Sequence, residues 1–383
     1  MGNKILAYAL GCLLSLAIVL PPTDYTIPLI HDPVLWTCLT LAAAMFGMYM
    51  LRFRALPIQL KVLSLYLFVT AFVSQGPHSS FNAYVVLIAS LGLFLAFMQV
   101  RNWVPIFDLI EAAFWVQVIL VTFQVAGWDR LLSFNRLGES HFLGTVTQYM
   151  RFSSVLAIMT PFLIIRNWKY IFLIAALAIV SQSSSFAISL LAGCGAFIFL
   201  NTSGWVKRTG IVCLVLFLGL CYAVYDRGSF EGAIVASNGG RLPSWEAVIR
   251  TWVFDTIKVV PGQELVGPIQ WKWIFLGHGL DTFMYLFPVY KHDSNPFAQA
   301  HNSWLQFGWE MGLIGLGVVV WWVGSLALRL YRCREYALVS GLVMFATNMM
   351  FCFPERMTQT APLLIGYLAL CQVCAREAEG SHC

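Results

Sequence analysis

Two polar residues, His301 and Asn302, open the apolar, glycine-spaced stretch HNSWLQFGWEMGLIG. An imidazole with an ordinary pKa of about 6.5 can accept a proton from a hydroxyl group near neutral pH, which is the chemistry of a general base. Asn302 and Ser303 are residue types that cap the first turn of a helix. The alternative for His301 is structural, a histidine that caps this helix or bonds to a backbone carbonyl.

The residues after His301 predict a helix that carries the histidine at its outer end. Because a residue advances about 100° around a helix, Gly308, Gly312 and Gly315 fall within about 40° of His301. Small residues on one face let a second helix approach closely. Glu310 points to the opposite side, and since a carboxylate within a membrane costs about 2.5–3.5 kcal/mol, we expect it to hydrogen-bond to another helix.

The composition requires a membrane to hold these elements. Hydrophobic residues make up 59% of the 383-residue chain and charged residues 11%, against about 25% charged in ordinary soluble domains. A helix needs roughly 17 to 25 apolar residues to cross a hydrocarbon core of about 30 Å, so we expect an all-α polytopic bundle of about twelve transmembrane helices in one membrane domain. The predicted spans lie near 4–20, 34–51, 57–73, 82–100, 104–126, 146–165, 168–181, 184–200, 206–225, 302–330, 336–353 and 358–375.

Lysine and arginine residues divide the short loops into two kinds. Every second connection carries them, whereas the connections PPTDYTIPLIHDP, SQGPHSSFN and SQSSS contain none. Since basic residues favour the cytoplasmic side, the pattern predicts that both termini are cytoplasmic. The long loop of residues 226–301, and His301 with it, then lies on the outer face.

One segment of this loop has helical periodicity. In PSWEAVIRTWVFDTIKV, Glu246 and Arg250 form an i,i+4 pair on one side of a predicted helix over 245–257. The opposite stripe consists of Trp245, Val248, Ile249, Trp252, Val253 and Ile257. We expect an amphipathic helix on the bundle or in the outer headgroup region, with its tryptophans at the interface. It is either part of a site or a lid without chemistry of its own.

These motifs resemble those of a known superfamily. The order His301-Asn302, nine residues, Gly312, two residues, Gly315 resembles the H-N-x9-G-x-x-G signature of O-antigen ligases and Wzy-type polymerases, which are bacterial inner-membrane glycosyltransferases. LGHGLDTF is similar to their G-x-G and aromatic element, and GGRLPSW to the arginine ahead of their tryptophan-bearing loop helix. The large periplasmic loop before the signature helix is similar too.

The resemblance implies transfer of a glycan from a polyprenyl-pyrophosphate carrier to an acceptor hydroxyl on the periplasmic face, without a metal or a cofactor. By position, His301 is the general base and Arg241 binds the pyrophosphate, because a guanidinium group matches phosphate oxygens. The acceptor is the lipid A core oligosaccharide in a ligase and a growing glycan in a polymerase. We take the ligase as the leading hypothesis and the polymerase as its alternative.

One feature departs from the family pattern. Many members carry an arginine after a serine-rich turn in the middle of the chain, where SQSSSFAISL has Phe186. Arginines on the predicted outer side could take its place, namely Arg136, Arg151, Arg250 and Arg356. We therefore place Arg241, Arg250, Arg151, Arg136 and Asn302 in the predicted substrate-binding set. Each arginine could instead be a snorkelling interfacial residue.

The remaining ionisable residues admit other interpretations. His278, His292, Asp293 and His301 lie close together in sequence, but their spacing fits no zinc pattern, so we expect neutral, solvated loop histidines and no metal. A secondary transporter or lipid-linked-sugar channel is the competing class, and it predicts broken helices with ionisable residues near the middle of the membrane. No basic tract typical of nucleic-acid binding is present.

A pair of carboxylates lies at the predicted inner end of the fifth span. Asp108 and Glu111 are three residues apart, so they share a helix face. They follow Pro105, and we expect them to interact with the positive end of the helix dipole. A proton relay is the alternative.

Overall fold

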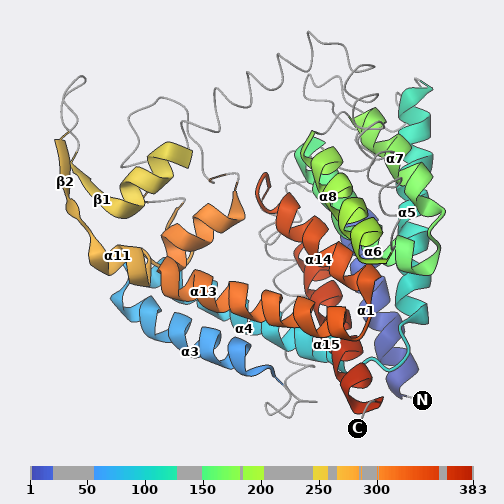
Figure 1. Cartoon of the computed structure of the whole chain (residues 1–383), viewed down its shortest axis with the longest axis horizontal. Helices are drawn as coiled ribbons and strands as arrows, with labels where there is room; N and C mark the ends of the chain where they lie inside the picture. Colours follow the sequence, from blue (N-terminus) through green and yellow to red (C-terminus); the bar gives the residue numbers. More distant parts are fainter. Residues whose placement is uncertain are drawn as a thin grey trace, which may run out of the picture. The chain divides into compact units, whose positions relative to one another are not determined.

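The computed structural model describes residues 2–19, 56–126, 149–181, 184–201, 245–257, 265–283, 286, 300, 302–352 and 360–381. The helices and strands are labelled in Figure 1, and the chain divides into two compact units. The first unit contains residues 1–55, 89–201 and 326–383, and the second contains residues 56–88 and 202–325. The predicted spans 34–51 and 206–225 lie outside the described residues.

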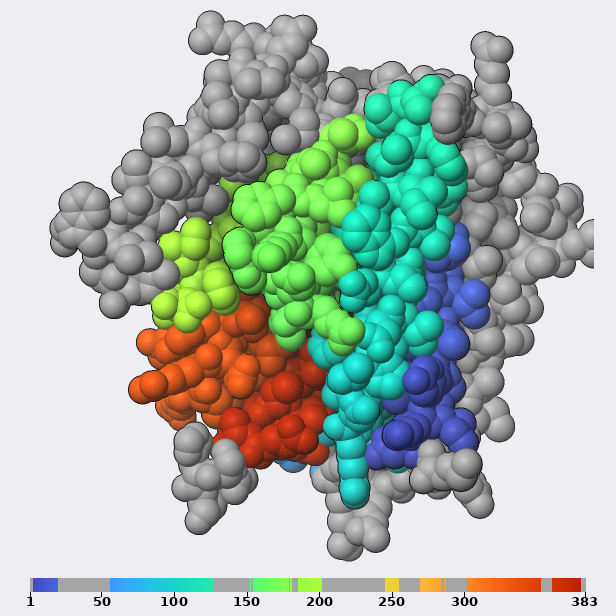
Figure 2. Space-filling view, turned by 90° about the vertical axis from the view of Figure 1, so that its right-hand side faces the viewer, coloured from blue at the N-terminus to red at the C-terminus, as the bar shows by residue number. Residues whose placement is uncertain are grey.

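The first unit consists of helices whose bounds fall close to the predicted spans. They are α1 (Gly2–Val19), α5 (Val104–Val125), α6 (Tyr149–Arg166), α7 (Tyr170–Ser181), α8 (Ser184–Asn201), α14 (Tyr336–Asn348) and α15 (Ala361–Ser381). The C-terminal part of α4 (Pro77–Met98) and the last turns of α13 (Ser303–Arg332) complete the unit. In the space-filling view, α5 in teal lies between α1 in blue and the green α6 and α7 (Figure 2).

Buried polar groups join the helices of this unit. The side-chain amide of Gln117 on α5 donates to the carbonyl oxygen of Ile18 on α1 at 2.8 Å. Asn348 on α14 donates to the hydroxyl of Ser189 on α8 at 3.4 Å. Bonds of this kind between helices are typical of transmembrane bundles, where few other groups can satisfy a polar side chain.

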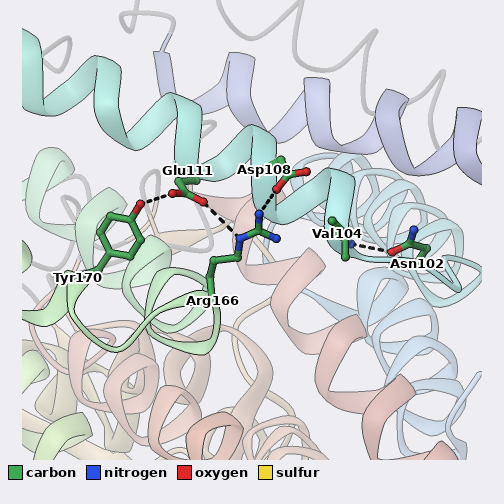
Figure 3. A network of polar contacts seen from close by, with 6 residues as sticks. All are labelled: Asn102, Val104, Asp108, Glu111, Arg166 and Tyr170. Atoms are coloured by element: carbon green, nitrogen blue, oxygen red, sulfur yellow. Dashed lines mark hydrogen bonds and ion pairs between the residues drawn. The ribbon is translucent and has the colours of Figure 1, made fainter.

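The carboxylates of α5 bind an arginine and a tyrosine (Figure 3). Arg166 at the end of α6 forms ion pairs with Asp108 and, at 3.4 Å, with Glu111. The hydroxyl of Tyr170 donates to Glu111. The predicted interaction with the helix dipole is wrong, because α5 begins at Val104 and its first turn holds no acidic residue. The network instead ties α5 to α6 and α7.

The second unit combines membrane-type helices with the described part of the long loop. Its elements are α3 (Ile58–Val73), the N-terminal part of α4, a helix over 245–253, β1 (Phe254–Ile257), β2 (Leu265–Ile269), α11 (Trp271–Leu276) and most of α13. The two strands pair antiparallel, with Phe254 opposite Ile269 and a register shift before Thr256. This hairpin is a departure from the all-α prediction.

The predicted loop helix is shorter than expected. It ends at residue 253, where β1 begins, because Phe254, Thr256 and Ile257 are aromatic and β-branched residues that favour a strand. Ile257 therefore lies in the hairpin, and Ile249 in the helix is 46% exposed. The predicted ion pair of Glu246 with Arg250 is confirmed at 2.8 Å.

Three of the described helices are long and apolar enough to cross a membrane, namely α4, α5 and α13. Several shorter described helices, α3 and α14 among them, are also apolar. The helices bear out a helical membrane protein in outline, while the total of about twelve spans stays a prediction.

Candidate functional site: a broken helix completed by the loop

Helix α13 breaks at Gly312. This residue has φ 65° and ψ −179°, a backbone region that is essentially restricted to glycine. A Cβ atom at this position would lie 2.2 Å from the carbonyl oxygen of Phe275. The break separates an N-terminal arm, residues 303–311, from the apolar remainder of the helix. Gly312 thus admits the loop backbone, and the expected continuous glycine face is interrupted.

Three backbone carbonyls beside the break receive donors from outside the helix. The N–H groups of His278 and Gly279 donate to the carbonyl oxygens of Trp309 and Glu310 at 2.9 and 3.0 Å. The hydroxyl of Tyr66 on α3 donates to the carbonyl oxygen of Met311 at 2.7 Å. Because an unsatisfied backbone group is costly in an apolar environment, these donors are what permits the break.

The two glycines of LGHGLDTF lie where the loop backbone packs too closely against its neighbours to leave room for a side chain. Gly277 and Gly279 have φ 76° and 118°, which side-chain-bearing residues rarely adopt. A Cβ atom on Gly277 would lie 2.2 Å from the carbonyl oxygen of Glu310. One on Gly279 would lie 2.4 Å from atoms of Ser74 and Ser80. The segment therefore fits between the break and the turn that joins α3 to α4.

That turn binds the other edge of the segment. The backbone N–H of Gln75 donates to the carbonyl oxygen of His278 at 2.9 Å. The hydroxyl of Ser80 donates to the carbonyl oxygen of Leu280 at 3.1 Å. The loop residues 277–280 are thus bonded on one side to α13 and on the other to the α3–α4 turn.

The His278 ring lies buried between two indoles. It is 1% exposed and stacks on Trp309 at 4.1 Å and on Trp273 at 5.3 Å between ring centroids. Its Nδ1 lies 2.9 Å from Oε1 of Gln75, and its Nε2 is buried. Burial lowers the pKa of His278 to about 3, although the carbonyl of Thr251 acts in the opposite direction. The histidine is neutral, but the expectation of a solvated ring is wrong.

The loop tryptophans Trp252 and Trp245 form hydrogen bonds within the second unit. Trp252 donates from its indole N–H to the carbonyl oxygen of Trp273 at 3.0 Å, and its ring covers Gly308 so closely that a Cβ atom there would lie 2.5 Å away. Trp245 donates to the carbonyl oxygen of Ala300 at 2.9 Å. Beneath them lies a small buried loop core of Val248, Phe283, Ala300 and Trp309. Trp252 packs against this core, and both tryptophans are partly exposed, so their position at a membrane interface stays a prediction.

His301 lies outside the described residues, but both of its neighbours are held in place. The N–H of Ala300 donates to Oε1 of Gln306 at 3.3 Å. Oδ1 of Asn302 accepts the N–H of Leu305 at 3.1 Å, and Asn302 is buried. The prediction that Asn302 caps the helix is therefore confirmed, with Ser303 as the first helical residue.

Glu310 is buried in the N-terminal arm and accepts a hydrogen bond from the side chain of Gln306 at 3.1 Å. This partner is one turn back on the same helix. The hydrogen bond of Glu310 to another helix stays a prediction.

Two of the predicted arginines, Arg250 and Arg151, lie in the part of the chain that the structure describes. Arg250 lies on the exposed side of the 245–253 helix and pairs with Glu246. Arg151 lies in the first turn of α6, in the first unit. Arg241, Arg136 and Arg356 are outside the described residues, as are His292 and Asp293. Among described side chains, no group of three ligating residues forms a metal site.

Two residues of the site were not singled out from the sequence, Tyr66 and Gln75. Their signal was weak, since a hydroxyl in the middle of the apolar helix α3 and an amide just past its end are both common. Neither a family model nor a curated protein matches the chain.

Proposed function

We propose that the protein is a periplasm-facing glycosyltransferase of the bacterial inner membrane, similar to O-antigen ligases. It transfers a glycan from a polyprenyl-pyrophosphate carrier to an acceptor hydroxyl such as that of the lipid A core. His301 acts as general base and Arg241 binds the pyrophosphate, with Arg250 as a further candidate. A polymerase that uses a growing glycan as acceptor is the alternative within the same chemistry.

The observation that carries this proposal is a contact between the two motifs on which the resemblance rests. His278 and Gly279, from the G-x-G element, donate to Trp309 and Glu310 in the stretch that follows His301. Gly312, a glycine of the signature, is the residue at which the helix opens to receive them. Motifs separated in sequence thus form one structural unit, and that unit holds Ala300 and Asn302 on either side of His301.

The proposed reaction needs a base and a cationic group on opposite sides of one carbon. The acceptor oxygen bonds to the anomeric carbon and gives its proton to the imidazole of His301. The bond between that carbon and the phosphate oxygen breaks, and the electron pair leaves with the pyrophosphate. A guanidinium group stabilises the charge that develops there.

The contacts of the loop agree with the predicted orientation. The α3–α4 turn belongs to a connection without lysine or arginine, and it bonds to residues 278–280 of the long loop. Two segments that the lysine and arginine pattern assigns to the outer face therefore meet within the second unit. This supports an outward-facing site, which the proposed acceptor requires.

The test is complementation of a bacterial host that lacks its own O-antigen ligase. We expect the wild-type chain to restore capped lipopolysaccharide, and His301→Ala and Arg241→Ala to abolish it at equal membrane levels. His78→Ala is the matched control, since His78 is an exposed histidine on α4. Loss of long chains with a single unit retained identifies a polymerase. A fully active His301→Ala variant would overturn the proposed catalytic role.

One observation favours the second candidate, a transporter or lipid-linked-sugar channel. Transporter sites are often built at discontinuous helices, and α13 is broken two residues after the buried Glu310. This class predicts flux of a lipid-linked or free sugar into proteoliposomes without a covalent product, and loss of that flux in Glu310→Gln. Covalent transfer in the purified system rules it out as the main activity.

A further inference from the structure

Helix α11 presents two aromatic rings outward. Trp271 and Phe275 are 62% and 45% exposed and stack on each other with centroids 6.3 Å apart. Ile269, at the end of β2, is 45% exposed just before them. The ammonium group of Lys272 lies 4.1 Å from the centre of the Trp273 ring. The result is an exposed apolar surface, hereafter the α11 surface, with a cation at its edge.

The opposite side of α11 is fixed to the second unit. The carbonyl oxygen of Trp273 accepts the indole N–H of Trp252. The hydroxyl of Tyr66 on α3 lies within hydrogen-bond distance of the carbonyl oxygens of Phe275 and Leu276, at 3.2 and 3.1 Å. These contacts hold the helix in one orientation, so the exposure of Trp271 and Phe275 is built into the fold.

The position of α11 along α13 indicates what covers this surface. The backbone of Phe275 lies against Gly312. From Gly312 to Arg329, the first cation at the other end of α13, the helix rises about 25 Å, close to the thickness of a hydrocarbon core. Leu313 and Ile314, which follow the break, are exposed apolar residues. With Arg329 placed at the inner edge of the hydrocarbon layer, this length puts Gly312 near its outer edge.

The exposed side of α3 continues the same apolar surface. Leu65 and Val69, which flank Tyr66 by one turn or less, are both exposed, as is Phe72 near the end of the helix. Since Tyr66 contacts α11 directly, the α11 surface lies beside a helix face that is suited to lipid. Tryptophan is enriched where hydrocarbon meets headgroups, and lysine side chains reach from there toward water.

We propose that the α11 surface, formed by Ile269, Trp271 and Phe275, inserts into the outer leaflet of the bilayer at the boundary between acyl chains and headgroups. The long loop is thereby anchored to the membrane through α11, and not through the tryptophans of the 245–253 helix. The anchor is independent of the proposed glycosyl transfer.

Depth-dependent quenching tests the insertion. The full-length protein is reconstituted in phosphatidylcholine and phosphatidylglycerol nanodiscs, with an environment-sensitive fluorescent amino acid at position 271 or 275. We expect a nitroxide high on the acyl chain to quench both probes at least twofold more than aqueous iodide does. Position 246, whose native glutamate is exposed, is the control and should show the reverse preference.

A second measurement uses the unmodified protein, so that it does not depend on a tolerated substitution. A photoactivated carbene reagent that partitions into acyl chains should label the peptide carrying residues 269–276, as mapped by mass spectrometry. Iodide quenching at 271 and 275 together with an unlabelled peptide overturns the proposal. So does a crosslink from position 271 to a second copy of the chain or to another protein in place of lipid.

Discussion

The backbone N–H of His278 donates to the carbonyl oxygen of Trp309 at 2.9 Å while the rings of the same two residues stack at 4.1 Å. One pair thus joins the loop to α13 through both backbone and side chains. The carbonyl of Trp309 can accept this bond because α13 is broken three residues later. The loop and the N-terminal arm therefore form a single cooperative structure. Disturbing either one is expected to destabilise both.

Gly312→Ala should destabilise the protein strongly. The backbone conformation of Gly312 alone costs a side-chain-bearing residue about 1–3 kcal/mol, and the added Cβ would meet the Phe275 carbonyl. Thermal unfolding in detergent should show a clear fall in midpoint temperature. Gly317→Ala is the matched control, because no atom lies within 4 Å of its added Cβ. That variant should unfold at the wild-type temperature or above it, since alanine favours a helix.

Tyr66→Phe removes the hydroxyl that donates to the carbonyl oxygen of Met311 beside the break. The carbonyl oxygen of Met311 loses its 2.7 Å donor in a part of the protein that water does not replace easily. We expect a loss of about 1–3 kcal/mol in the free energy of unfolding. In Tyr84→Phe, which loses only a 3.2 Å contact with the hydroxyl of Ser64, the loss should be smaller. Equal losses in the two variants would argue against a special role for Tyr66.

His278 should make stability depend on acid. Folding lowers its pKa from 6.5 to about 3, so below pH 6.5 the unfolded chain binds a proton that the folded chain does not. The stabilisation is complete above pH 6.5 and is lost as the pH falls toward 3, by up to about 1.4 kcal/mol per unit. Midpoint temperatures at pH 5 and pH 7.5 measure this slope. His278→Phe keeps a stacked ring and should flatten the slope.

The contact of Gly308 with Trp252 can be tested by a double-mutant cycle. Gly308→Ala places a methyl group 2.5 Å from the far edge of the indole and should cost about 1–3 kcal/mol. Trp252→Phe removes that edge, so adding Gly308→Ala to it should cost much less. The difference, an interaction free energy of about 0.5–3 kcal/mol, is read from chemical unfolding of the four proteins. Additive effects would mean that the ring moves away freely.

Substitutions of Asn302 distinguish its role as a helix cap from a role in substrate binding. Asn302→Ala removes the cap on the N–H of Leu305 and should cost about 0.5–2 kcal/mol, whereas Asn302→Ser keeps a capping oxygen and should be nearly as stable as the wild type. If Asn302 also contacts the substrate, the serine variant will fold normally yet lose activity in the complementation assay. Full activity of a stable Asn302→Ser variant assigns the residue to structure alone.

Much of the helical framework could be predicted from the sequence, because apolar length and the distribution of lysine and arginine are properties of single segments. Described helices such as α5 and α13 begin and end within a few residues of the predicted spans. The cap at Asn302 and the ion pair of Glu246 with Arg250 were also predictable, since both depend on residues at most four positions apart.

The break in α13 could not be predicted in the same way. Gly308, Gly312 and Gly315 look alike in a helical projection, and only the loop backbone at Phe275 distinguishes Gly312 from the other two. The buried state of His278 depends likewise on Trp273 and Trp309, one within the loop and one on α13. Such features arise from contacts between distant segments, which hydrophobic periodicity does not encode.

The three donors that complete the break have a consequence for how the protein is made. A ribosome synthesises Tyr66 first, the 277–279 segment next and the carbonyls of residues 309–311 last. Each donor has therefore been synthesised before its acceptor. When α13 leaves the insertion machinery, the donors for the carbonyls of residues 309–311 are already present. A chimera that exchanges the loop must keep Gly312 in the following span, because without this glycine α13 cannot open to receive residues 277–279.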